Sequence, residues 1–146
     1  MASWSRFAEE APDLSERVRA RFQVTKHHVL ATLRRDGSPR ASGTEVEFDG
    51  GDIYLGSMGG SVKARDLQRD PRFALHSNPG DGSMQGGDAK ISGTVEEVAP
   101  PGSHPGSHRF RMSIEEVVLT SLHPQGDRLV IETWNPGRPV QRRERF

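Results

Sequence analysis

Cysteine is absent from this chain of 146 residues, and hydrophobic residues make up only 32% of it. Without thiols the protein has no disulfides, zinc-thiolate sites, iron–sulfur clusters or cysteine nucleophile. No apolar run approaches the roughly 20 residues that a membrane-spanning helix needs. The N-terminal sequence also lacks the apolar core of a signal peptide. We therefore expect a soluble, cytoplasmic protein without membrane contacts.

An excess of charge of either sign is missing as well. Lysine and arginine number 20 and are balanced by 20 acidic residues, so no whole-chain field attracts nucleic acid or an anionic membrane. The length suits one domain that spans residues 1–146. Because the apolar content is lean for a domain rich in Gly and Pro, we expect a second copy to complete part of the buried surface.

Strand signals dominate the sequence after one helix. The helix is predicted at about residues 13–23, where Asp13 is the expected N-cap and Glu16 completes a capping box. The strands are predicted at 29–34, 40–48, 53–57, 73–77, 89–98, 116–122 and 129–134. Asp-Gly turns join the first three of them, which indicates a meander. Strands joined mostly by short turns favour a small barrel with helices at its edges.

The remaining segments are predicted as connections. Loops are expected at 78–88 and 100–108, with a helical turn close after the second, around Phe110 and Met112. The tail at 137–146 is rich in arginine. Such a tail is most often solvated, but it could also bind an anionic cofactor tail or acidic residues of a partner.

The segment at 56–67, GSMGGSVKARDL, is the most informative part of the chain. It connects an apolar strand to a short helix that Ser61 opens, and it also places Ser57, Gly60 and Lys63 at the junction. A Gly/Ser turn at a helix start aims free N–H groups at one point, and a lysine there opposes the helix dipole unless an anion lies nearby. A phosphate site is the simplest interpretation. The alternative is an ordinary strand-to-helix connection, because neither Walker nor dinucleotide spacing is present.

The other polar residues and Trp134 give weaker evidence for a functional site. His27 and His28 would point to opposite faces of a strand, and the Pro-Gly between His104 and His108 opposes a helix, so no metal site is expected. Paired glutamates in the strand at 40–48 are typical of the wet face of a sheet. Trp134 ends a strand, where tryptophan is usually a core or interface anchor, although a flat ring or a partner subunit could pack there.

Residues 29–76 together resemble the pyridoxamine phosphate oxidase-like superfamily, split β-barrel proteins that bind FMN or the deazaflavin coenzyme F420. The likeness lies in the order strand, DGSP, strand, turn, strand, GSMGGSVKARDL and DPR. Near the end of the chain, LVIETWNPG resembles the family strand that ends in a tryptophan close to the flavin. The fold implied is mainly β within the α+β class: a six-stranded split β-barrel with a few peripheral helices.

The resemblance also implies a cofactor site. In such proteins the Gly/Ser–Lys turn holds the cofactor phosphate, a strand of the hairpin passes the ring, and the tryptophan forms a wall for ring or substrate. The implied cofactor-binding residues are Ser57, Gly60, Ser61, Lys63, Arg40, Ser42, Thr44 and Trp134. Family sites lie between two barrels, which implies a homodimer.

The implied function is an oxidoreductase that transfers a hydride between bound FMN or F420 and a small organic substrate, with the ring carrying the hydride. No catalytic side chain or metal is then required. A non-catalytic module that binds or stores flavin, F420 or haem is the alternative, and the residues do not choose between FMN and F420. Two departures argue against pyridoxamine phosphate oxidation itself. Ser42 stands where the vitamin-forming oxidases carry a phosphate-binding arginine, and their histidine after the tryptophan has no counterpart in PGRPVQRRERF.

Overall fold

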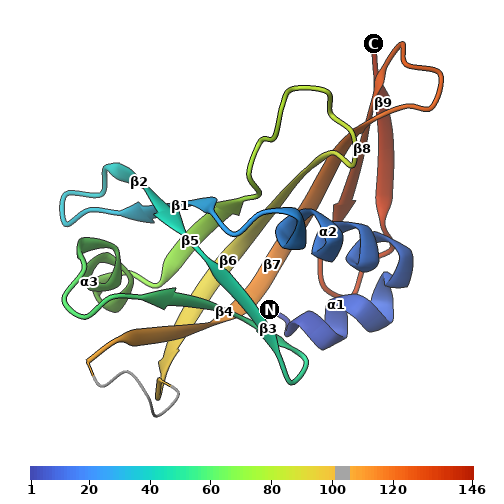
Figure 1. The fold of residues 1–146 in the computed structure, drawn as a ribbon. Helices are drawn as coiled ribbons and strands as arrows, with labels where there is room; N and C mark the ends of the chain where they lie inside the picture. Colours follow the sequence, from blue (N-terminus) through green and yellow to red (C-terminus); the bar gives the residue numbers. More distant parts are fainter. Residues whose placement is uncertain (101–105) are drawn as a thin grey trace.

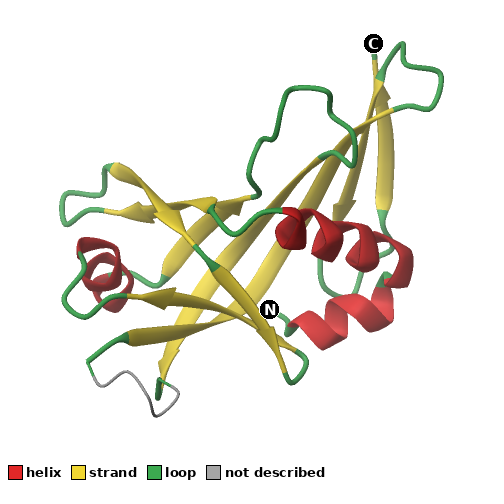
Figure 2. Ribbon diagram, in the orientation of Figure 1, coloured by secondary structure: helices red, strands yellow, loops and turns green. Residues whose placement is uncertain are grey.

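The computed structural model describes residues 1–100 and 106–146, which form a mainly antiparallel β structure with helices at its edges (Figures 1 and 2). The helices are α1 (Trp4–Glu10), α2 (Pro12–Val24) and α3 (Val62–Arg69). The strands are β1 (His28–Leu33), β2 (Pro39–Thr44), β3 (Val46–Asp49), β4 (Asp52–Ser57), β5 (Arg72–His76), β6 (Asp88–Val98), β7 (His108–Leu122), β8 (Leu129–Trp134) and β9 (Gln141–Arg145). The α+β class is confirmed, whereas the strand number is wrong: in the described residues one sheet holds nine strands instead of six. Most of the loop predicted at 100–108 lies outside the described residues.

The sheet has the order β2-β1-β5-β6-β7-β4-β3, with β8 and then β9 added beside β7. The single strand predicted at 40–48 breaks at Glu45, so that β2 pairs with β1 while β3 pairs with β4. The two hairpins of the predicted meander therefore exist, but they lie at opposite ends of the strand order. The hydroxyl of Thr44 donates to the carbonyl of Glu45 at 3.2 Å, a local hydrogen bond that competes with the ladder at the break.

Strand β7 connects the two parts of the sheet, because it pairs with β6, β4 and β8. The helical turn predicted around Phe110 and Met112 is wrong: both residues belong to β7 and are buried, two positions apart on its inner face. The register between β6 and β7 shifts between Ser92 and Gly93, and a Cβ at this glycine would lie 2.0 Å from the carbonyl oxygen of Ser113. Only glycine fits such a close approach.

The helix α1 is absent from the sequence prediction. Its N-cap is Ser3, whose hydroxyl accepts a hydrogen bond from the amide of Arg6 at 3.2 Å. The next helix, α2, agrees with the prediction to within about a residue, but its expected capping box is wrong. Pro12 occupies the first turn instead, and no side chain caps the helix. In Figure 1 the pair α1 and α2 lies on one side of the sheet and α3 lies at the far end.

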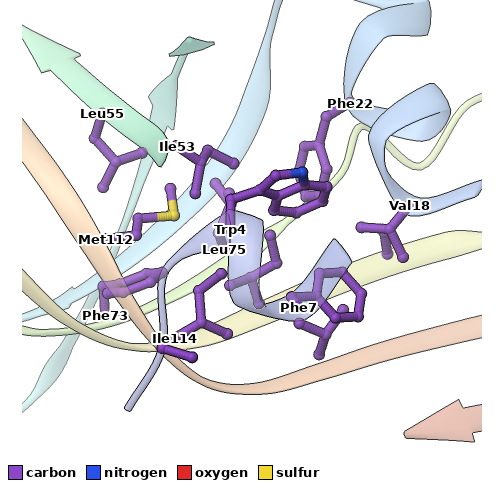
Figure 3. Packing of buried hydrophobic residues seen from close by; sticks show 14 of the residues in the cluster. Trp4, Phe7, Val18, Phe22, Ile53, Leu55, Phe73, Leu75, Met112 and Ile114 are labelled. Atoms are coloured by element: carbon purple, nitrogen blue, oxygen red, sulfur yellow. The ribbon is translucent and has the colours of Figure 1, made fainter. Parts of the chain in front are cut away.

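The hydrophobic core forms where α1 and α2 cover the inner face of the strands (Figure 3). Trp4 and Phe7 of α1 meet edge to face, with ring centroids 5.1 Å apart, and Trp4 also contacts Phe48 of β3 at 4.9 Å. Each such buried aromatic side chain stabilises the fold by about 1.5–3 kcal/mol. The N-terminal helices thus supply core surface that the composition led us to expect from a second copy.

The arginine-rich tail contains a strand. Gln141–Arg145 forms β9, which pairs with β8 and has every residue exposed. None of the helices in residues 1–100 and 106–146 is long and apolar enough to cross a membrane.

Candidate functional site

A groove of about 810 Å³ lies where the end of β2, the end of β4 and the start of α3 meet. The loop before β1 and the residues just before β7 complete its walls. The lining includes Gly43, Thr44, Ser57, Met58, Gly59 and Lys63. Met58 is 83% exposed, so the predicted anion turn carries an apolar side chain that no other described residue covers.

The turn between β4 and α3 gathers the predicted hydroxyl groups. Ser61 is the N-cap of α3, and its Oγ accepts from the amide of Ala64 at 3.2 Å. The hydroxyls of Ser57 and Ser61 are hydrogen-bonded to each other, and that of Ser57 donates to the carbonyl of Met58. Gly60 has a φ of 73°, a left-handed conformation that favours glycine. Three of the predicted cofactor-binding residues, Ser57, Gly60 and Ser61, therefore lie in one compact turn, and Ser57 lines the groove.

Lys63 connects this turn to β2. Its Nζ donates to the carbonyl oxygen of Gly43 at 2.8 Å, and within the described residues no carboxylate lies within ion-pairing distance of it. Burial lowers the pKa of Lys63, and the negative charge of Glu45 partly offsets this effect. A partly buried ammonium group with one neutral partner favours an anion beside it, since charge-assisted hydrogen bonds are the stronger kind.

The residues predicted on β2 separate along the strand. Thr44 lines the groove, whereas Ser42 is half-buried and does not belong to its lining. Arg40 lies toward the other end of the strand, where its Nε donates to the carboxylate of Asp66 at 2.7 Å. The structure thus brings one of these three residues to the groove.

Asp66 is a buried carboxylate that the sequence reasoning missed. It accepts hydrogen bonds from Thr32 at 2.7 Å, from Arg40 at 2.7 Å and from Arg69 at 2.9 Å. Burial by itself would raise the pKa of Asp66, but the hydrogen bonds from its three partners outweigh burial, so the pKa is lowered. The ionised group fastens α3 to β1 and β2, and so it holds the helix start beside the groove. Its only sequence signal is an aspartate on the inner face of an amphipathic helix.

A second missed group joins the turn to β6 and β7. Nδ1 of His108 lies 2.7 Å from a carboxylate oxygen of Glu97, and the amide of Gly60 donates to Nε2 of His108 at 3.3 Å. Gln68 of α3 donates to the other oxygen of Glu97 at 2.8 Å. Hydrogen bonds, from His108 first and then from Gln68, lower the pKa of Glu97. The residue His104, which the sequence reasoning paired with His108, lies outside the described residues.

Trp134 does not line the groove. Its side chain is fully buried, and its ring centroid is 4.7 Å from that of Phe7. Of the two roles weighed for Trp134, the structure places it as a core anchor. The described residues also contain no group of three or more His, Asp or Glu side chains placed to hold a metal ion.

Fold and groove together define a mainly antiparallel β protein with an open cleft, at which a Ser/Gly/Lys turn begins a short helix. The sequence profile of pyridoxamine 5'-phosphate oxidase matches residues 14–133. The chain therefore belongs to the pyridoxamine 5'-phosphate oxidase-like family. No curated protein matches the sequence.

Solved structures of low sequence identity share the fold. A protein of unknown function from Agrobacterium tumefaciens aligns with a TM-score of 0.54 and 20% identity over 70% of this chain, which spans only 55% of that protein. An F420 reductase aligns with a TM-score of 0.51 and 17% identity, covering 62% of this chain and 87% of the reductase. The haem storage protein HutZ from Vibrio cholerae aligns with a TM-score of 0.59 and 13% identity, covering 75% of this chain and 94% of HutZ.

Proposed function

We propose that the groove binds a phosphate-bearing flavin-type cofactor, FMN or F420, and that the protein is an oxidoreductase acting on a small organic substrate. The observation that carries this proposal is the position of Lys63, a partly buried ammonium group in the groove whose hydrogen-bond partner among the described residues is a neutral carbonyl. Membership of the family supports a flavin-type cofactor. The F420 reductase among the similar structures is the reason to consider F420 as well as FMN.

The donor set of the groove suits a phosphate. Lys63 supplies a positive charge, and the hydroxyls of Ser57 and Ser61 are already at hydrogen-bonding distance from each other. These hydroxyls can turn toward an anionic oxygen, because a hydroxyl donor rotates about its C–O bond. Lys63 and the two serines would hold the phosphate, and the exposed Met58 would cover part of the cofactor.

The groove offers room for the remainder of the cofactor and for a substrate. It shares Glu45 and Gly56 with a second hollow of about 590 Å³. Phe22 and Phe48 line that hollow, and the guanidinium of Arg19 lies 4.6 Å from the centre of the Phe48 ring. Apolar walls with a few charged groups are typical of sites for flat organic molecules. When bound, the cofactor ring supplies the hydride chemistry, and these side chains orient it and limit the access of water.

Cofactor titration tests the proposal. Purified protein is titrated with FMN, F420 and riboflavin, and binding is followed by absorbance and fluorescence. We expect FMN or F420 to bind, and riboflavin, which has the FMN ring without its phosphate, to bind more weakly than FMN. The proposal fails if neither phosphate-bearing cofactor binds, and the phosphate site is misplaced if riboflavin and FMN bind equally.

A non-catalytic binding module is the second candidate. His27 lines the groove, and histidine is a common axial ligand of haem iron. The structural likeness to a haem storage protein supports this alternative. Two experiments distinguish the candidates. In a haem titration of the wild type and of His27→Ala, a Soret shift that depends on His27 supports the haem module. In a kinetic experiment, rapid reoxidation of a bound reduced cofactor by a small acceptor supports the oxidoreductase.

We also propose that two copies of the chain associate. A hollow of about 370 Å³ on the outer face of β1, β5, β6 and β7 is lined largely by apolar side chains, among them Val29, Ala31, Ala74 and Val118. Val29 is 42% exposed in the single chain. A second copy would bury this face, as the family resemblance implies. Light scattering should then give a dimer for the wild type and a monomer for Val29→Glu. A wild-type monomer at micromolar concentration contradicts the proposal.

A further inference from the structure

We propose that His108 is a ligand of the anion at the β4–α3 turn and that binding of the anion is coupled to protonation of its Nε2 atom. The inference rests on the proposed function, in which this turn receives a phosphate, and it adds a residue and a pH dependence to that site. Neither follows from the turn itself, because His108 belongs to β7 and is far from the turn in the sequence.

The tautomer of His108 follows from its partners. A carboxylate accepts hydrogen bonds only, so the contact of 2.7 Å with Glu97 places a proton on Nδ1. In a neutral imidazole the lone pair then lies on Nε2, and Nε2 accepts the hydrogen bond from the amide of Gly60 at 3.3 Å. Gln68 binds the second oxygen of Glu97, so the carboxylate is held from α3 as well as from β7.

Protonation of Nε2 reverses its role. A proton taken from solvent occupies the lone pair, and the amide of Gly60 loses its acceptor. Two donors, the Gly60 N–H and the His108 Nε2–H, then face the same space. An anionic oxygen accepts from both and also lies beside the imidazolium charge. Binding of the anion therefore takes up a proton, and protonation in turn favours the anion.

The groups around His108 favour this behaviour. Glu97 on β6 contacts it directly, and its lowered pKa keeps it ionised beside the imidazolium. From β7 itself, Arg109 shares a small hollow with His108, and Glu47 of β3 pairs with this arginine at 2.6 Å. Tyr54 of β4 lines the same hollow, and α3 presents the neutral amide of Gln68. The ring of Phe110 is stacked 6.2 Å away. The charge in direct contact with His108 is thus negative.

Sulfate is the probe for the first experiment, because its charge does not change between pH 5.5 and 8. Sulfate is titrated into isotopically labelled protein at constant ionic strength set with chloride. The amide signal of Gly60 reports binding, and the ring signals of His108 report whether Nε2 is protonated. We expect sulfate to increase the protonated fraction of the His108 ring at a given pH. The dissociation constant of sulfate should increase by up to about tenfold per pH unit once Nε2 is deprotonated.

Two variants provide the controls. His108→Gln keeps a side chain that can accept from Gly60 but cannot be protonated, and we expect its sulfate affinity to become independent of pH in this range. His123→Gln removes an imidazole in the turn between β7 and β8, which lines neither the groove nor the hollow beside His108, and it should retain the pH dependence of the wild type. Equal pH dependence in the wild type and His108→Gln, or His108 ring signals that sulfate leaves unchanged, overturns the inference.

The outcomes separate this inference from the proposed function. If FMN or F420 binds through Lys63 but neither cofactor affinity nor sulfate affinity responds to His108, the proposed function stands and the present inference fails. If sulfate binds with the expected proton uptake while FMN and F420 do not bind, the His108 site stands and the cofactor assignment fails. If no anion affects the Gly60 signal, both are wrong.

Discussion

The indole of Trp134 packs against the phenyl ring of Phe7, with 4.7 Å between the ring centroids and no exposed surface on either side chain. The contact joins the end of β8 to α1, two elements that lie at opposite ends of the chain. The family resemblance had implied that this tryptophan lies beside the cofactor, but its ring is buried against Phe7. We therefore expect mutations of Trp134 to affect stability and mutations of the groove to affect ligand binding.

Trp134→Ala is expected to reduce the free energy of unfolding by about 3–5 kcal/mol, because it removes a large buried side chain and leaves a cavity beside Phe7. Urea unfolding followed by circular dichroism measures this loss. The smaller change Trp134→Phe should leave enough folded protein for cofactor titration, with the dissociation constant unchanged. A weakened cofactor in folded Trp134→Phe would contradict a purely structural role.

Lys63→Ala should weaken the binding of FMN or F420 by about 1–3 kcal/mol, because it removes a charge-assisted hydrogen bond to the phosphate. This loss corresponds to roughly 5- to 150-fold in the dissociation constant from fluorescence titration. Arg143→Ala is a matched control, since it removes one positive charge from the exposed strand β9. Equal losses in the two variants would indicate a general effect of net charge.

Asp66→Asn should reduce the free energy of unfolding at pH 7 by about 3–5 kcal/mol, because it leaves the arginines that pair with Asp66 without a charged acceptor. Since folding lowers the pKa of Asp66, its contribution is fully present above about pH 4, the ordinary pKa of an aspartate, and is lost as the pH falls through the lowered value. The difference from the wild type should therefore narrow below pH 4.

Urea unfolding at a series of pH values measures this difference for Asp66→Asn. Asp70→Asn serves as the control, since Asp70 is paired with Arg72 at the exposed end of the same helix. A loss in Asp70→Asn as large as that in Asp66→Asn would show that burial of Asp66 is not the cause.

His28 should make the protein less stable in mild acid. Its Nε2 donates to the carbonyl of Phe22, and its Nδ1 accepts from the amide of Asn78, both at 3.0 Å. Burial lowers the pKa of His28, so the unfolded chain binds a proton more readily than the folded one. The contribution of neutral His28 to the free energy of unfolding is then fully present above about pH 6.5. Between that pH and the lowered pKa of His28, the free energy of unfolding falls by about 1.4 kcal/mol per pH unit as the pH decreases.

Thermal or urea unfolding between pH 5 and 8 tests this dependence, with His28→Gln as the comparison. The variant should be less stable at pH 8 and should lose less stability between pH 6.5 and 5 than the wild type does. Parallel pH profiles for the two proteins would assign the acid sensitivity to other groups.

Several elements could be predicted because their signals are local. The alternation of Ala89, Ile91 and Val95 with polar residues identified β6, and the Asp-Gly turns identified two hairpins. The helix α1 escaped prediction because seven residues are too few for a helix to be stable by itself. Its stability comes from contacts of Trp4 and Phe7 with distant residues. The break at Glu45 escaped as well, since alternation continues across it and does not say which strand pairs with which.

The sequence by itself determined the local part of this protein: the order of strands and turns, and a turn in which Ser57, Ser61 and Lys63 lie within seven consecutive residues. Such neighbours remain together in any arrangement of the sheet. The tertiary structure alone decided that Asp66 holds Arg40, that Trp134 lies in the core, and that His108 reaches Gly60. Each of these contacts joins residues that are distant in the chain, and such residues meet only when strands pair and apolar surface is buried.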